Sequence, residues 1–181
     1  MRMIRVGTIP TFPKSPYARK QLSLPSQSLA RLYARPGFLL RRAHQISAAV
    51  FEDECRAVGL TPAQFGVLTV VRANPGLDQS SLARALGFDK VTVLRVIRGL
   101  ETRGLVSRVT SPLSKRHLSI SLSPAGTQLL QDAQKPAEQA YNRLMGPLDE
   151  AQQARLLELL QLLTTGLEDS ARAVFVPPSA D

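Results

Sequence analysis

Four polar or basic residues at helical spacing are the residues of this sequence best suited to bind another molecule. They are Lys90, Thr92, Arg95 and Arg98. An apolar stripe recurs beside them at intervals of three residues, in Val91, Leu94, Ile97 and Leu100. This spacing predicts one helix with an apolar face and a basic face. Arginine can donate two hydrogen bonds to guanine, threonine can contact several bases, and both lysine and arginine neutralise phosphates.

We therefore expect this helix to bind DNA, with Thr92 and Arg95 at base edges and Lys90 and Arg98 at phosphates. A short helix with basic side chains is more commonly only a solvated face. The prediction therefore depends on the elements that position the helix.

The neighbouring elements have the order of a winged helix-turn-helix. Asp78 can cap a helix that continues through Leu86, and Gly87 ends it before Asp89 starts the helix of residues 90–103. Two alternating apolar runs, at 105–109 and 118–122, then predict a hairpin with a basic, polar tip. Further DNA contacts are expected from Ser80 and Ser81 in the first helical turn, Arg108 on the first strand, and Lys115 and Arg116 at the tip. Arg108 could equally be a solvated strand residue.

The composition fits a mainly α protein with a small β-hairpin wing. Aromatic residues make up 5% of the 181 residues and tryptophan is absent, while leucine dominates the 44% that are hydrophobic. The single cysteine excludes an intramolecular disulfide, and no apolar run approaches the ~20 residues of a membrane span. We therefore expect a soluble, cytoplasmic protein that contacts no membrane.

Charge is unevenly distributed along the chain, whose net charge is +9. Residues 78–121 carry eight Lys and Arg against three Asp and Glu, whereas residues 122–181 carry four against eight. Residues 1–35 carry no acid and contain several prolines, so we expect a flexible basic arm. A mitochondrial transit peptide is the alternative, and the prolines oppose it. The basic middle of the chain indicates an anionic partner, with double-stranded DNA the leading candidate.

The C-terminal third is expected to form two helices separated by Gly146-Pro147. Ser123-Pro124 can start the first helix, which Pro136 would interrupt or bend. Asp149 can cap the second, whose seven leucines exceed what one face of a solvated helix needs. They are Leu156, Leu157, Leu159, Leu160, Leu162, Leu163 and Leu167. Such a helix must bury two sides, and a second subunit is a plausible cover.

The run from Leu77 to Leu122 resembles the MarR family of transcriptional regulators. The most specific pieces are the L-A-x-x-L-x-x-D-x-x-T-V pattern of residues 82–93, L-E-x-x-G-L-V at 100–106, and L-S-P-A-G at 122–126. The resemblance covers about residues 36–170. It implies a homodimer that grips a pseudo-palindromic operator with two winged helices, and a small-molecule pocket between the dimerisation and DNA-binding parts.

The resemblance also implies how the chain is divided into domains. We expect an arm at 1–35, an N-terminal dimerisation helix at 36–60, the winged helix-turn-helix at 61–123, C-terminal dimerisation helices at 124–172 and a disordered tail at 173–181. One position departs from the family. Its wings commonly carry Asp two residues before the minor-groove Arg, whereas this chain has Ser114 two residues before Arg116. Arg116 can still insert, and Lys115 could share its role or contact phosphate.

Residues 38–45 and 59–65 resemble the MarR subgroup that responds to aromatic carboxylates or their thioesters. The resemblance implies a repressor that the ligand releases from DNA. An anionic aromatic ligand needs a cation and an apolar wall, which Arg42 or His44 with Phe51 or Phe65 could supply. The plainer alternative places His44 at a dimer interface and both phenylalanines in the core.

Three other functions compete with this hypothesis. An enzyme is disfavoured because the sequence lacks H-E-x-x-H, G-x-S-x-G and phosphate-loop motifs, and we expect no catalytic residue, cofactor or metal. A redox sensor would use Cys55, but the adjacent acidic residues 52–54 should raise the thiol pKa and suppress the thiolate. A non-specific DNA-binding protein would use the basic arm and show little preference for a palindrome.

Overall fold

The computed structural model describes residues 27–111 and 114–178, with only the backbone described at 110, 111 and 114–117. The chain divides into two compact units, residues 1–41 and 42–181. The helices are α1 (Gln27–Tyr33), α2 (Pro36–Glu54), α3 (Pro62–Ala73), α4 (Gln79–Leu86), α5 (Lys90–Thr102), α6 (Pro124–Met145) and α7 (Glu150–Gly166). Strands β1 (Val106–Ser111) and β2 (Ser114–Leu122) pair antiparallel, and a short 3-10 turn occupies Glu168–Ser170. The predicted fold class, mainly α with a small hairpin, is confirmed.

The described part of the first unit contains α1 and the start of α2. The Tyr33 and Phe38 rings lie 5.1 Å apart, and the Arg41 guanidinium lies 5.0 Å from the centre of the Phe38 ring. Helix α1 lies inside the segment predicted as an irregular arm. Its sequence, QSLARLY, contains neither proline nor glycine, so nothing local opposes helix formation. Residues 1–26 of the predicted arm lie outside the described residues.

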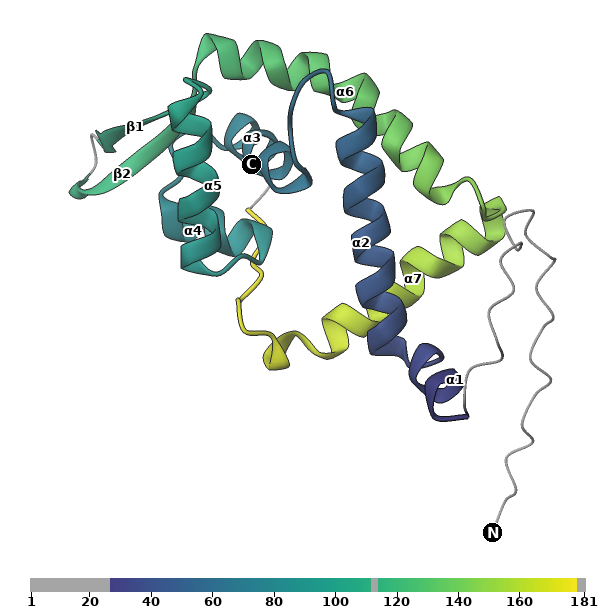
Figure 1. Ribbon diagram of the computed structural model, residues 1–181. Coiled ribbons are helices and arrows are strands. Elements are labelled where there is room, and N and C mark those ends of the chain that lie inside the picture. Colours follow the sequence, from purple (N-terminus) through teal and green to yellow (C-terminus); the bar gives the residue numbers. More distant parts are fainter. Residues whose placement is uncertain (1–26, 112–113, 179–181) are drawn as a thin grey trace. The chain divides into compact units, whose positions relative to one another are not determined.

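The hydrophobic core of the second unit joins α3, α4, α5, the hairpin and α6. Its fully buried side chains include Val67, Leu68, Leu82, Val93, Ile97, Leu100, Ile120 and Leu130. Figure 1 shows α4 and α5 next to the projecting hairpin, with α6 leaving from the hairpin's base. The core therefore fixes α5 and the hairpin to one rigid support.

A close backbone approach connects the hairpin to α6. The Ser123 hydroxyl donates to the Gly104 carbonyl at 2.7 Å, and the Ser123 backbone N–H donates to the Leu105 carbonyl at 3.0 Å. A Cβ at position 126 would overlap the Leu105 carbonyl, so only glycine fits there. The L-S-P-A-G motif thus holds the start of α6 against the turn between α5 and β1.

Helix α6 continues through Pro136 without interruption, which settles the choice between a break and a bend. Figure 1 shows α6 changing direction along its length, as expected when proline removes one backbone donor. Asp149 caps α7 as predicted, with its carboxylate accepting from the Gln152 N–H at 2.9 Å. None of the residues of α7, all of which the structure describes, is buried.

Part of the predicted disordered tail is ordered. The Val176 N–H donates to the Arg84 carbonyl of α4 at 3.0 Å, and the Phe175 N–H donates to Glu168 Oε1 at 2.9 Å. No local sequence signal indicates these long-range bonds. Residues 179–181 lie outside the described part of the chain. Among the described residues, no helix is long and apolar enough to cross a membrane.

Candidate nucleic-acid interface

The turn between α4 and α5 depends on one glycine and two aspartates. Gly87 has φ of +61°, a left-handed conformation that ends α4. The Phe88 N–H donates back to the Ala83 carbonyl at 2.9 Å, and the Phe88 side chain packs against the core. Asp78 caps α4 through the Ser81 N–H at 2.8 Å, and Asp89 caps α5. The left-handed Gly87 and the two aspartate caps, which the local sequence predicts, therefore define where α4 ends and where α5 begins.

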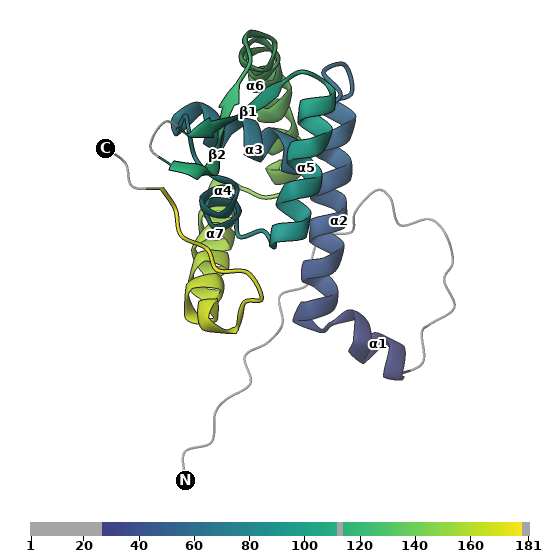
Figure 2. The same cartoon turned by 90° about the vertical axis from the view of Figure 1, so that its left-hand side faces the viewer.

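Helix α5 turns one apolar edge to the core and one basic edge to solvent. Its buried residues are Val93, Ile97 and Leu100, which follow each other at four and three positions. The predicted stripe is wrong at Val91, whose side chain is 77% exposed. At 100° per residue, Val91 lies nearly opposite Val93 and shares its face with Arg95 and Arg98. In Figure 2 the side of the unit that bears α5 and the hairpin is turned toward the viewer.

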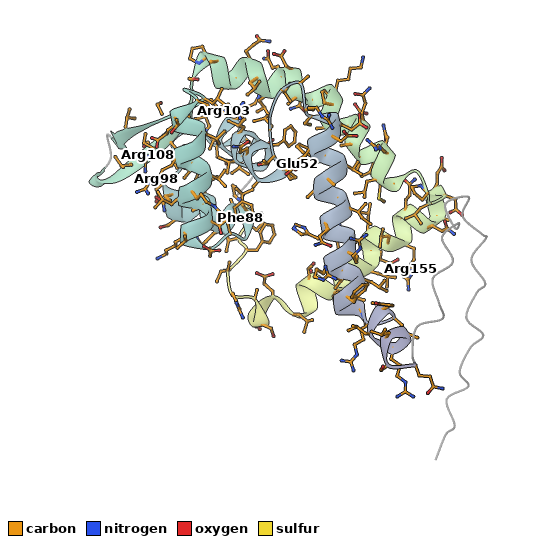
Figure 3. The ribbon with its side chains drawn as sticks, viewed as in Figure 1. Glu52, Phe88, Arg98, Arg103, Arg108 and Arg155 are labelled. Carbon is orange, nitrogen blue, oxygen red and sulfur yellow. The ribbon has the colours of Figure 1, made fainter. Side chains whose placement is uncertain are left out.

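The three basic residues predicted on α5 are all exposed. Lys90, Arg95 and Arg98 meet solvent, and Thr92 is half-buried beside them. Arg98 and Arg108 lie on the side of α5 from which the hairpin projects (Figure 3). The helix thus presents cations and hydrogen-bond donors along one accessible edge, a surface suited to a DNA groove and its phosphates.

Arg103 holds the C-terminal end of α5, a role that the sequence did not reveal. Its guanidinium donates to the Gly59 carbonyl at 2.8 Å and to the Val58 carbonyl at 3.3 Å. These carbonyls end the turn after α2, more than 40 residues earlier in the chain. No local pattern signals such a pairing, because any arginine at the end of a helix has the same sequence appearance.

Arg108, one of the predicted DNA contacts, forms an ion pair in this structure. Its Nε donates to Glu101 Oε1 and its Nη2 lies near Glu101 Oε2, both at 2.7 Å, and both side chains are about three-quarters buried. Neither of the two predicted roles, phosphate contact or solvated residue, included this partner. The pair joins β1 to α5, so Arg108 fixes the hairpin relative to the exposed helix.

The serines at the start of α4 differ in their surroundings. Ser80 is exposed, whereas the Ser81 hydroxyl accepts from Arg84 Nη2 at 3.1 Å. Arg84 is itself an exposed cation on α4 that the sequence analysis did not select. The first turn of α4 can therefore meet a phosphate through Ser80 and through Ser81 with Arg84 behind it.

The hairpin tip falls partly outside the described residues. Lys115 and Arg116 lie on β2, and their side chains are not described, so their predicted roles stay predictions. The base of the hairpin is secured by the loop before α4. The Ile120 N–H donates to the Leu77 carbonyl at 2.9 Å, and the Gly76 N–H donates to the Ile120 carbonyl at 3.0 Å.

The four predicted ligand residues are only partly brought together. The Phe51 and Phe65 rings lie 5.5 Å apart, and both are half-buried. His44 is exposed on the same face of α2 as Phe51, about 10 Å along the axis. Arg42 is exposed on the opposite face, about 13 Å from Phe51 along the axis. Of the four residues, only the two rings are in contact, His44 shares the Phe51 face of α2, and Arg42 faces elsewhere.

Cys55 is fully buried behind the end of α2. Burial raises the pKa of its thiol, and the neighbouring Glu54 carboxylate raises that pKa further. Of the two causes, burial is larger than the acidic neighbour that the sequence pointed to. A buried thiol with little thiolate character reacts slowly with oxidants, so the redox-sensor hypothesis loses support.

Comparison with known proteins gives consistent matches. The sequence profile of the MarR family matches residues 58–117, which extend from the turn before α3 into β2. The chain is 35% identical over 131 residues to a Thauera aromatica protein described as regulating transcription of the hcr operon. That alignment covers 70% of this chain and 77% of the Thauera protein.

Two solved structures add evidence at the level of the fold. BpsR of Bordetella bronchiseptica, whose DNA binding is described as regulated by 6-hydroxynicotinic acid, has a TM-score of 0.69 and 30% identity. That match covers 73% of this chain and 94% of BpsR. The repressor CouR, solved on a 23-mer DNA duplex, has a TM-score of 0.70 and 31% identity over 79% of this chain and 99% of CouR.

Proposed function

The chain belongs to the MarR family of transcriptional regulators, and from this premise we propose that it is a homodimeric repressor released from a pseudo-palindromic operator by a small aromatic carboxylate or its thioester. The family consists of DNA-binding regulators, and the protein is not an enzyme. The proposal concerns how the dimer forms, which face meets DNA and which ligands release it.

The exposed edge of α5 carries the DNA-binding part of the proposal. Arg95 and Arg98 lie one turn apart on the face opposite the buried Val93, with Lys90 at the helix start. The caps at Asp78 and Asp89 and the Arg108–Glu101 pair hold this edge and the hairpin on one support. A preorganised cationic edge of this kind suits insertion into the major groove with the hairpin beside it.

The exposed leucines of α7 support the homodimer. Leu156, Leu157, Leu159, Leu162 and Leu163 are each between 37% and 69% exposed in the single chain. A continuous apolar surface of this length on a helix without buried residues is unfavourable in water. A second copy of α7 would cover it, and a twofold dimer would present two α5 helices to two half-sites.

The effector class is supported by relatives and by the aromatic pair. BpsR responds to 6-hydroxynicotinic acid, a carboxylic acid on an aromatic ring. In this chain the Phe51 and Phe65 rings could contact a ring of that size, and His44 could meet its carboxylate. The turn that follows α2 is hydrogen-bonded to Arg103 at the end of α5. A ligand that moves α2 at these rings could therefore change the position of α5.

A mobility-shift assay tests the proposal. The DNA is a duplex recovered by selection from a randomised library, and the ligands are a panel of benzoates, hydroxycinnamates, pyridine carboxylates and their thioesters. A responsive compound should weaken binding by about 5- to 150-fold, a coupling of about 1 to 3 kcal/mol. Phe65→Ala should reduce the response, with Phe175→Ala as the aromatic control. Release by peroxide but by no compound of the panel would overturn the effector proposal.

A further inference from the structure

The Asp89 carboxylate receives three hydrogen bonds at the start of α5. Asp89 Oδ1 accepts from the backbone N–H of Val91 at 2.9 Å and of Thr92 at 2.8 Å. Asp89 Oδ2 accepts from the Thr92 hydroxyl at 2.7 Å. Helix capping needs only the first oxygen. The second oxygen therefore fixes the side chain of Thr92.

This arrangement determines the direction of the Thr92 hydroxyl proton. An ionised carboxylate has no proton to donate, so Thr92 must be the donor in the 2.7 Å bond. The backbone and side-chain hydrogen bonds from Thr92 hold the pKa of Asp89 below its ordinary value, which keeps the carboxylate ionised at neutral pH. With its single proton committed, Thr92 Oγ1 offers only lone pairs to any further partner.

Thr92 lies within the exposed edge that the proposed function assigns to the major groove. Val91 beside it is 77% exposed, and Arg95 follows three residues later. The N-terminal end of a groove helix is the part whose side chains reach base edges. Along this edge Val91 thus offers an apolar group, Thr92 a hydrogen-bond acceptor and Arg95 hydrogen-bond donors.

The four bases differ in what they present to an acceptor. In the major groove adenine carries the N6 amino group and cytosine the N4 amino group, whereas guanine O6 and thymine O4 are acceptors. An acceptor-only hydroxyl can bond to an amino group and is repelled by a keto oxygen. An ordinary threonine, free to rotate its proton, distinguishes these two classes poorly.

We propose that Thr92, oriented by Asp89, is a specificity-determining residue that selects adenine or cytosine over guanine or thymine at one position of each half-site. The inference rests on the proposed function, since it requires α5 in the major groove. The exposed Val91 methyl groups would contact a thymine methyl next to that position. Asp89 is a positioning residue, because it acts on the base only through Thr92.

Two substitutions test the inference in different ways. Thr92→Val keeps the shape of the side chain and removes the hydroxyl, so the preference at this position should disappear. Asp89→Asn keeps a capping oxygen, since asparagine caps helices as well as aspartate does. Its amide NH₂ would take the place of Oδ2 and donate to Thr92 Oγ1. The hydroxyl proton would then be free for the base, so the preference for adenine or cytosine should be lost. Cytosine, which presents only an amino donor in the major groove, should become the least favoured base.

The control is Thr102→Val, at the other end of the same helix. The Thr102 hydroxyl donates to the Arg98 carbonyl at 2.9 Å, so this variant also removes one helix-bound hydroxyl, but far from the N-terminal turn. Its selected DNA motif should equal that of the unmodified chain. Circular dichroism of all four proteins checks that each is folded.

The experiment is a selection from randomised duplexes with the full chain and the three variants, followed by sequencing. The unmodified chain should prefer adenine or cytosine at one position by about tenfold, and Thr92→Val should reduce that ratio to about one. One motif shared by all four proteins would overturn the inference and leave the proposed function standing. Selection of no motif by the unmodified chain would overturn both. If Asp89→Asn does not fold, Thr92→Val decides alone.

Discussion

The DNA-binding lobe, residues 61–123, and helix α7 differ in how far their large apolar side chains are buried. In residues 61–123 the large apolar side chains Leu68, Leu82, Ile97 and Leu100 are fully buried, and the helices end in side-chain caps or glycines. In α7 five leucines are more than a third exposed, although the helix is as well capped. The lobe buries these four side chains in its own core, whereas the leucines of α7 form a surface that the single chain does not cover. This difference supports the proposed dimer, in which a second copy would cover the exposed leucines of α7.

The largest effect should come from placing charges on the exposed face of α7. Leu159→Asp with Leu163→Asp puts two carboxylates one turn apart where we propose a second copy binds. The dimer should dissociate in sedimentation measurements, and operator affinity should fall by about 100-fold or more because two linked half-site contacts become independent. Gln161→Asp on the same helix is the control. A double variant that remains dimeric would show that another surface forms the contact.

A core substitution in the lobe should lower the free energy of unfolding by the same amount at every protein concentration. Leu82→Ala removes a fully buried side chain and should lower the free energy of unfolding by about 2 to 5 kcal/mol. Leu162→Ala, at a 69% exposed position, should cost little in a dissociated chain. It should weaken the proposed dimer, so its destabilisation should appear only at protein concentrations at which the unmodified chain is dimeric. Equal, concentration-independent losses at both positions would remove the distinction between the two regions.

Within the lobe, Arg95 and Arg98 should separate recognition from general affinity. Arg95→Ala should cost about 1 to 3 kcal/mol on the selected operator and much less on random duplex. Arg98→Ala should weaken both duplexes similarly and lower the salt slope by about 1 per phosphate contact. A salt titration of each variant on both DNAs measures this. If Arg95→Ala weakened both duplexes equally and Arg98→Ala weakened only the operator, Arg98 would contact bases and Arg95 would contact phosphates.

The smallest effect concerns the pH dependence of the Asp89 cap. The pKa of Asp89 is lowered in the folded chain, so its stabilisation is fully present above the ordinary aspartate pKa and is lost as pH falls through the lowered one. Urea unfolding of Asp89→Asn across this acidic range should therefore lose part of the pH dependence of the unmodified chain. Thr102→Val, which removes no carboxylate, is the control and should keep the full dependence. An unchanged pH dependence in Asp89→Asn would contradict this role of the cap.

The local elements of the fold could be predicted because each has its own sequence signal. Asp78, Gly87 and Asp89 bound two helices through caps and a left-handed turn, and Ser123-Pro124 starts α6. Periodicity misplaced Val91 because a strict three-residue spacing turns by about 60° per step around a helix of 3.6 residues per turn, so Val91 and Leu100 lie on opposite sides of α5. Packing of Val93 against the core decided between them.

The contacts between distant residues could not be predicted. Arg103 on the Gly59 carbonyl, Arg108 on Glu101 and Val176 on the Arg84 carbonyl all depend on which surfaces the fold brings together. The basic residues of α5 could be selected because charge and helical spacing coincide there. The ligand candidates could not be ranked, since the sequence does not show that Arg42 and Phe51 face opposite sides of α2.

Selection from randomised duplexes, followed by competition against random DNA at one salt concentration, tests the central claim most directly. We expect an inverted repeat whose half-sites lie about one helical turn or a multiple of it apart, bound at least about 10³-fold more tightly than random duplex. Recovery of sequences without a repeated motif, bound no better than random DNA, would contradict it.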